Sequence, residues 1–295
     1  MDKDEVIIVK NITDNTYEKI VERAVRYSLI SLPFTIDRMK IPDESKRALN
    51  IAKGKIAEEL FKWFCVQNNI KVDFAICETP FWQTDKRDFV MNGYEWDIKN
   101  NFLYLQKKFF YDYTCLPALI PNRHPGDQWN TKNERKIPGS KGVRYLFTFM
   151  KGAGLYRNKR GKYFLEINLS KKQKEILRFL YSKYQGKPAN SKPFHEKDFW
   201  EKFNAHNPKL FNLNYKPELV ITGFAGDSIW HKFKDTGPYS KPNYIDFIKP
   251  YWYRKTGKNN SLSWCNGVLW TKITNKTIPI RYLPSFKEFT GFTGI

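Results

Sequence analysis

Residues 87–99 read Arg-Asp-Phe-Val-Met-Asn-Gly-Tyr-Glu-Trp-Asp-Ile-Lys, and this stretch predicts a β-hairpin from which the rest of the fold can be worked out. The dipeptide Asn92-Gly93 is typical of a two-residue hairpin turn, because both residues tolerate the positive φ that such turns require. We therefore expect the flanking residues 87–91 and 94–102 to pair as antiparallel strands.

The second strand of this hairpin would place polar and apolar side chains on opposite faces. Because successive side chains of a strand alternate, Glu95, Asp97 and Lys99 share one face. Trp96 and Ile98 share the other face and can enter the core. Two acids and a lysine on one face are unusual for a purely structural strand, and they are expected if that face lines a site. The alternative is a surface hairpin with ordinary ion pairs.

Asp88 begins the first strand, where pairing across the turn would bring its carboxylate towards that of Asp97. Two neighbouring carboxylates repel each other unless a cation lies between them, and Mg²⁺ prefers carboxylate ligands completed by water and phosphate. The backbone carbonyl of Ile98 can add a ligand. Lys99, beside such a metal, could orient or deprotonate an attacking water, or stabilise the transition state. The pattern predicts a metal site at Asp88, Asp97 and Ile98.

The surrounding elements predict an α/β fold with a mixed central sheet flanked by helices. Apolar residues at helical spacing predict a helix over residues 43–68, and residues 143–150 are typical of a buried strand. Further predicted strands cover residues 4–10, 71–81, 163–169 and 218–224, and further predicted helices cover residues 15–30, 103–120 and 171–184.

Asp88, followed nine residues later by Asp97-Ile98-Lys99, resembles the motif of the PD-(D/E)XK nucleases, the restriction-endonuclease-like superfamily. In that family the first acid begins the second core strand and the acid-x-lysine lies on the third, an order that fits residues 45–150. Arg87 stands where the family name has proline. The resemblance implies a restriction-endonuclease-like fold and Mg²⁺-dependent phosphodiester hydrolysis, for which Mn²⁺ can substitute. Asp88 and Asp97 would hold the metal and Lys99 would support the water.

Many members of that family add a glutamate from the preceding helix. Residues 54–58, Gly-Lys-Ile-Ala-Glu, resemble the Gly-x-x-x-Glu pattern of resolvase-like members and select Glu58 as an assisting catalytic residue. The helical period favours Glu59, which lies nearer the apolar face. Either acid can equally be a solvated helix side chain. Asp85 competes with Asp88 as the first acid, but it lies in an expected turn.

The chain carries a formal net charge of +21, which favours a polyanionic partner such as DNA, expected to be double-stranded. Residues 1–150 hold 20 of the 30 acidic side chains, so the second half is strongly basic. The basic helix 171–184 and residues 249–258, where aromatic side chains alternate with bases, are candidate nucleic-acid contacts. The loop around His124 is another. A merely basic soluble protein is the alternative.

We expect one continuous domain with a nuclease core at residues 1–155, its catalytic hairpin at 87–101, and a basic elaboration at 156–295 that completes the sheet and contacts nucleic acid. The four cysteines are widely spaced and form no C-x-x-C pair, so neither a structural zinc site nor disulfides are expected. A signal peptide and a membrane-length apolar run are not found, which predicts a soluble, cytoplasmic protein.

These features predict a Mg²⁺-dependent endonuclease acting on DNA. The resemblance favours a type II restriction endonuclease that works as a homodimer. The alternatives are a structure-specific or repair and recombination nuclease, and a DNA-binding protein without catalytic activity.

Overall fold

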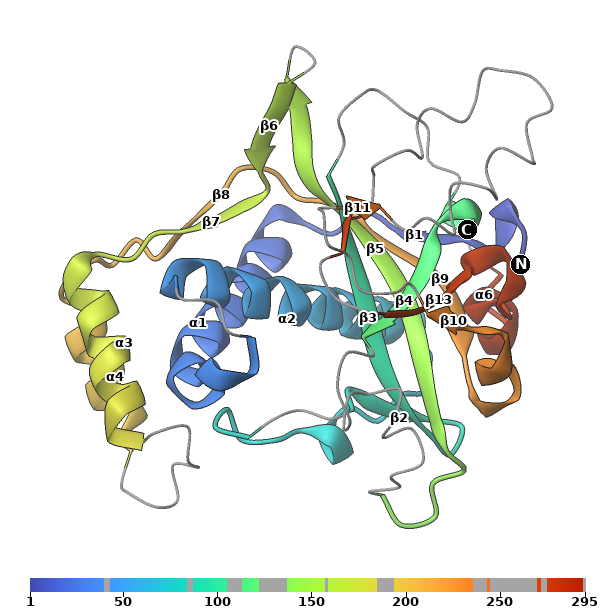
Figure 1. Ribbon diagram of the computed structural model, residues 1–295, viewed down its shortest axis with the longest axis horizontal. Coiled ribbons are helices and arrows are strands. Elements are labelled where there is room, and N and C mark those ends of the chain that lie inside the picture. The colour runs from blue at the N-terminus through green and yellow to red at the C-terminus, as the bar shows by residue number, and fades with distance from the viewer. Residues whose placement is uncertain are drawn as a thin grey trace.

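The computed structural model describes residues 1–39, 43–83, 87–104, 113–121, 137–156, 159–184, 194–235, 243–244, 270–271 and 275–293. A six-stranded mixed sheet lies at its centre, in the order β1-β9-β5-β3-β2 with β6 paired to β5 (Figure 1). Its strands are β1 (Ile7–Val9), β2 (Phe89–Met91), β3 (Tyr94–Tyr104), β5 (Val143–Tyr156), β6 (Lys159–Tyr163) and β9 (Leu219–Ala225). Strands β3 and β5 run parallel and the other pairs antiparallel. Strand β9 lies within residues 156–295, so this part of the chain contributes to the sheet together with residues 1–155.

Two long helices, α1 (Asp14–Met39) and α2 (Glu44–Gln67), lie against one face of the sheet (Figure 1). Asp43 caps α2 by accepting a hydrogen bond from the backbone nitrogen of Lys46 at 2.8 Å, which satisfies one of the free donors of the first turn. The buried ring of Phe61 on α2 lies 5.0 Å from that of Phe89 on β2. This packing fixes the hairpin against the helix.

The opposite face of the sheet is covered mainly by a second, three-stranded antiparallel sheet of β10 (Lys234–Asp235), β13 (Asn275–Pro279) and β4 (Pro117–Pro121). Three short 3₁₀ helices complete this layer: η3 (Tyr113–Cys115), η5 (Asp227–Lys232) and η6 (Ile280–Tyr282). Trp230 and Phe233 pack there on Tyr145 and Phe147 of β5. A mixed central sheet flanked by helices is therefore confirmed, with the helices on one face and this small sheet on the other.

A helical pair, α3 (Lys171–Tyr184) and α4 (Glu196–Asn204), stands at the end of α1 and α2 away from β5 (Figure 1). It is joined to the sheet by the ribbon of β7 (Leu165–Ile167) and β8 (Phe211–Leu213). The remaining elements are η1 (Lys3–Glu5), η2 (Ala75–Cys77), α6 (Phe286–Thr290), and the paired β11 (Asn243–Tyr244) and β12 (Trp270–Thr271).

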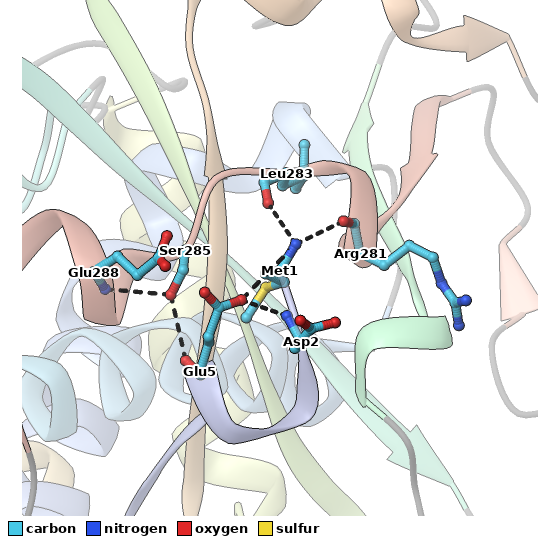
Figure 2. Close-up of polar contacts among 7 residues, drawn as sticks. All are labelled: Met1, Asp2, Glu5, Arg281, Leu283, Ser285 and Glu288. Carbon is cyan, nitrogen blue, oxygen red and sulfur yellow. Dashed lines mark hydrogen bonds and ion pairs between the residues drawn. The ribbon is translucent and has the colours of Figure 1, made fainter.

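The first residues lie against residues 281–288, so sequence positions far apart close the fold together (Figure 2). The amino nitrogen of Met1 donates to the carbonyl of Arg281 at 2.7 Å and to that of Leu283 at 3.4 Å. The hydroxyl of Ser285 caps α6 by accepting from the backbone nitrogen of Glu288 at 3.3 Å. These contacts hold α6 where its apolar side chains reach the core.

Several predicted elements are confirmed closely. The predicted helix 43–68 is α2, with bounds one residue shorter at each end. The helix 171–184 is α3 with the same bounds, and the hairpin turns at Asn92-Gly93 with φ of 53° and 79°. The helix predicted at 15–30 continues to residue 39.

Two predictions are wrong. Residues 71–81 do not form a regular strand: they contain the 3₁₀ helix η2 and a single bridge between Asp73 and Val90. The helix predicted at 103–120 is also not found among its described residues, because β3 continues to Tyr104 and residues 117–121 form β4. Short apolar runs fit a helix or a strand equally well, and here pairing with the distant β13 decides for the strand.

Within the described part of the chain, no helix combines the length and the apolar character needed to cross a bilayer.

Candidate functional site

The hairpin places Asp88 opposite Asp97. In the ladder of β2 and β3, Phe89 pairs with Trp96 and Val90 with Glu95, so Asp88 faces Asp97 one step further along. The backbone nitrogen of Asp88 donates to the carbonyl of Trp96 at 2.8 Å, which extends the hairpin to this point. The expected approach of the two acids across the turn follows from this register.

The side chains of β3 alternate as the pattern predicted. Trp96 and Ile98 belong to the core cluster beneath α2. Asp97 and Lys99 project to the other face, where Lys99 Nζ lies 2.5 Å from Asp97 Oδ1 and 5.4 Å from the ring of Tyr145. Both side chains are mostly buried. The lysine therefore reaches one oxygen of the acid from the same strand face.

The second carboxylate oxygen of Asp97 is the notable atom of this pair. Asp97 Oδ2 is buried and has no hydrogen-bond partner among the residues that the structure describes. An oxygen of a buried acid without a partner costs free energy comparable to a lost hydrogen bond, about 1–3 kcal/mol or more. A bound cation would satisfy this oxygen.

Asp88 carries the strongest electrostatic perturbation in the hairpin. Burial raises the pKa of its carboxyl group well above the ordinary value, and the nearby carboxylates of Glu58 and Asp97 raise this pKa further. The backbone nitrogen of Ile98, which donates to Asp88 Oδ2 at 2.5 Å, and the ammonium group of Lys55 act in the opposite direction on the pKa. The charges of Glu58 and Asp97 thus both act on Asp88.

Ile98 directs its backbone towards Asp88. In a strand, the N–H and C=O of one residue point to the same neighbouring side, and the nitrogen of Ile98 already donates to Asp88. Its carbonyl therefore points to the same edge of β3, where it can join Asp88 as an oxygen ligand. This direction supports the predicted role of the Ile98 carbonyl.

The structure distinguishes Glu58 from Glu59. Glu58 acts on the pKa of Asp88 and pairs with Lys55, whose Nζ lies 2.6 Å from Glu58 Oε2. Glu59 pairs instead with Arg23 of α1 at 2.7 Å. Of the two helix acids, the one selected by the Gly-x-x-x-Glu pattern is the one beside Asp88.

A cavity of about 310 Å³ lies next to these acids, between α1, α2 and residues 74–79. Glu58, Glu59 and Asp88 line it together with Lys55, Lys62 and Arg23, and Tyr27 and Phe74 add aromatic walls. Asp97 and Lys99 are not among its lining residues. The cavity therefore opens on the side of Asp88 and the helix, and the Asp97–Lys99 pair lies behind Asp88 on the strand.

Glu95 has a structural contact that its position in the sequence does not reveal. It shares a strand face with Asp97, but its Oε2 lies 3.4 Å from Nε of the buried Arg87. Its other oxygen accepts from the backbone nitrogen of Ile137 at 3.4 Å. Arg87 thus holds the first strand of the hairpin to the second.

Tyr145 is a neighbour of the site that was missed in the sequence, where it reads only as part of an apolar strand. It pairs with Asp97 in the parallel register of β3 and β5. Burial raises the pKa of its hydroxyl, and the charge of Asp97 raises it further. Tyr145 is therefore a neutral hydroxyl group beside the acid.

The donor set fits a hard divalent cation. Among the described residues, no three histidine, cysteine, aspartate or glutamate side chains are gathered as a metal site. Mg²⁺ needs fewer protein ligands, because it commonly keeps several waters and binds one or two carboxylates plus phosphate. Asp88, the unpartnered oxygen of Asp97 and the carbonyl of Ile98 are oxygen donors of the kind that such a site uses.

Three sequence candidates lie outside the described residues: Asp85, His124 and the basic segment 249–258. The basic helix 171–184 is described, and its Arg178 donates to Glu44 of α2 at 2.5 Å.

No protein-family model, curated protein or solved structure matches the chain.

Proposed function

We propose that this chain is a Mg²⁺-dependent endonuclease that hydrolyses phosphodiester bonds in DNA. The observation that carries the proposal is the group of Asp88, Asp97 and Lys99 on one hairpin, with a buried oxygen of Asp97 left without a partner. Such a group is costly to fold without a ligand, and a buried acid with a raised pKa, as at Asp88, is a feature of functional sites. The net charge of +21 supports a polyanionic substrate.

The proposed roles follow from the contacts of each side chain. Asp88, Asp97 and the Ile98 carbonyl would hold the metal, which when bound lowers the pKa of a coordinated water and neutralises charge on the phosphate. Lys99, held beside Asp97, would orient the attacking water or donate to a non-bridging phosphate oxygen. Glu58, beside Asp88, would assist at the cavity side.

The resemblance to the PD-(D/E)XK nucleases supports a restriction-endonuclease-like fold and, more narrowly, a type II restriction endonuclease that acts as a homodimer. A structure-specific or repair nuclease has the same chemistry with a different substrate. The purified chain is therefore incubated with plasmid, branched DNA and RNA in Mg²⁺ or Mn²⁺. Discrete plasmid fragments support the restriction enzyme, and cleavage of branched DNA alone supports the structure-specific nuclease.

The site assignment is tested with matched variants. Asp97→Asn and Lys99→Met should each lower cleavage by about a hundredfold or more, since removing one group that stabilises the transition state costs about that much. Glu58→Gln is compared with Glu59→Gln, its neighbour on the same helix, and only the first should reduce cleavage. Wild-type rates in the Asp97 and Lys99 variants would refute the assignment. A wild-type chain that binds DNA but cleaves no nucleic acid would favour a non-catalytic binding protein.

A further inference from the structure

Lys55 lines the cavity together with the candidate-site acids Glu58 and Asp88. It precedes Glu58 by one turn of α2, and its Nζ is 2.6 Å from Glu58 Oε2, with both side chains about three-quarters buried, at 22% and 26% exposed. The same ammonium group lies 4.9 Å from the ring centroid of Tyr27 on α1. Lys55 therefore has a defined position, with Glu58 as a charged partner.

The charges around this lysine explain the position. Glu58, Glu59 and Asp88 line the same cavity, and its other basic lining residues are Arg23, Lys62 and Arg87, the last of which pairs with Glu95 at 3.4 Å. Arg23 is engaged by Glu59 at 2.7 Å. Lys62 lies near Glu78, at 3.9 Å. The positive charge of Lys55 thus lies at Glu58, and it also acts on Asp88.

A divalent cation at Asp88 would disturb this arrangement. The cation and the ammonium group of Lys55 would then be attracted by the same carboxylates and would repel each other. A lysine side chain can respond, because its ammonium group is carried on a flexible four-carbon chain with three rotatable donors. The adjoining cavity of about 310 Å³ offers space for that movement.

We propose that Lys55 is an exchangeable counter-ion of the site: it neutralises Glu58 in the metal-free chain and, once a divalent cation binds, turns into the cavity to bind a phosphate oxygen of the nucleic acid. This inference rests on the proposed function. It assigns to the cavity a phosphate-binding role next to the metal, and it makes Lys55 a substrate-binding residue whose position depends on whether the metal is bound.

The inference predicts that one substitution, Lys55→Met, changes the affinities for Mg²⁺ and for duplex DNA in opposite directions. Lys55→Met removes the competing charge, so Mg²⁺ should bind about tenfold more tightly, which corresponds to about 1.4 kcal/mol. The same variant loses a phosphate contact, so it should bind a duplex oligonucleotide about tenfold more weakly in Ca²⁺, which is used to hold the substrate without cleavage. A lysine that only stabilises α2 would move both affinities little and lower the melting temperature instead.

Lys62→Met is the matched control. Lys62 lies on the same helix and lines the same cavity, but it contacts Glu78 and the ring of Phe74. Titration calorimetry with Mg²⁺ alone and duplex binding in Ca²⁺ are measured for the wild type, both methionine variants and Lys55→Arg. Lys55→Arg should restore duplex binding, because it keeps the charge. Lys55→Gln is the second variant if Lys55→Met does not fold.

The two proposals fail in different ways. If Asp97→Asn abolishes cleavage while Lys55→Met and Lys55→Gln keep wild-type affinities for Mg²⁺ and duplex, the role of Lys55 is refuted and the nuclease assignment stands. Weaker Mg²⁺ binding in Lys55→Met would also refute the proposed role of Lys55. A wild-type chain that neither binds Mg²⁺ nor cleaves nucleic acid overturns both.

Discussion

Replacing Arg87 by methionine should destabilise the fold by about 3–5 kcal/mol, because it leaves the buried carboxylate of Glu95 without its guanidinium group. Arg87 Nε lies 3.4 Å from Glu95 Oε2, and the two side chains are 6% and 0% exposed. At that distance and an effective dielectric constant of about 20, the attraction is about 5 kcal/mol. Glu95 also accepts a long hydrogen bond, at 3.4 Å, from the neutral backbone nitrogen of Ile137.

The assay is denaturant unfolding followed by far-ultraviolet circular dichroism for Arg87→Met, Glu95→Leu and the double variant. The double variant should recover most of the loss, because an apolar pair of similar volume removes both desolvation costs. The double-mutant cycle then gives the coupling free energy of the pair. A loss below about 1 kcal/mol in Arg87→Met, or additive losses in the double variant, would refute the reasoning.

Three further predictions concern the same hairpin and its surroundings. Asp88→Asn should stabilise the fold in EDTA by about 1–3 kcal/mol, because it removes a buried acid that faces two other carboxylates. The melting temperature measures this, and a lower value in the variant would contradict it. Gly93→Ala should cost about 1–2 kcal/mol in denaturant unfolding, since the residue has φ of 79° and an added Cβ would lie 3.1 Å from the side chain of Lys141; unchanged stability would contradict it. Burial raises the pKa of Cys77 to about 12, so its thiolate fraction at pH 8 is small. Iodoacetamide reacts with the thiolate, and it should therefore label Cys77 at least about a hundredfold more slowly in the folded chain than in denaturant. Peptide mass mapping measures this, and equal rates would be the contrary result.

The elements that were predicted correctly carry strong local signals. Asn92-Gly93 determines its own turn, since the required φ values belong to those two residues. Helix α2 combines an apolar stripe with Asp43 as a cap and Asn68 at its end. These features depend on neighbours within a few positions, so a single sequence is sufficient to locate them.

The prediction at 103–120 fails because its outcome depends on a distant partner. Strand β4 exists through its pairing with β13, and the hydroxyl of Thr277 donates to the carbonyl of Ala118, 159 positions away, at 2.8 Å. An apolar run of this length is compatible with a helix or a strand, and nothing within it indicates where the partner lies.

The alternation that puts Asp97 and Lys99 on one face of a hairpin can be read from residues 94–99 alone, because a strand has a fixed period of two. Which acids act on Asp88 depends on how α2 packs against the hairpin. The tertiary structure brought the charge of Glu58 to act on Asp88, paired Glu59 with Arg23 and Arg87 with Glu95, and placed Lys55 beside Glu58 at the cavity. The physical reason is that periodicity gives the direction of a side chain within its own element, whereas burial and electrostatic partners depend on how separate elements pack.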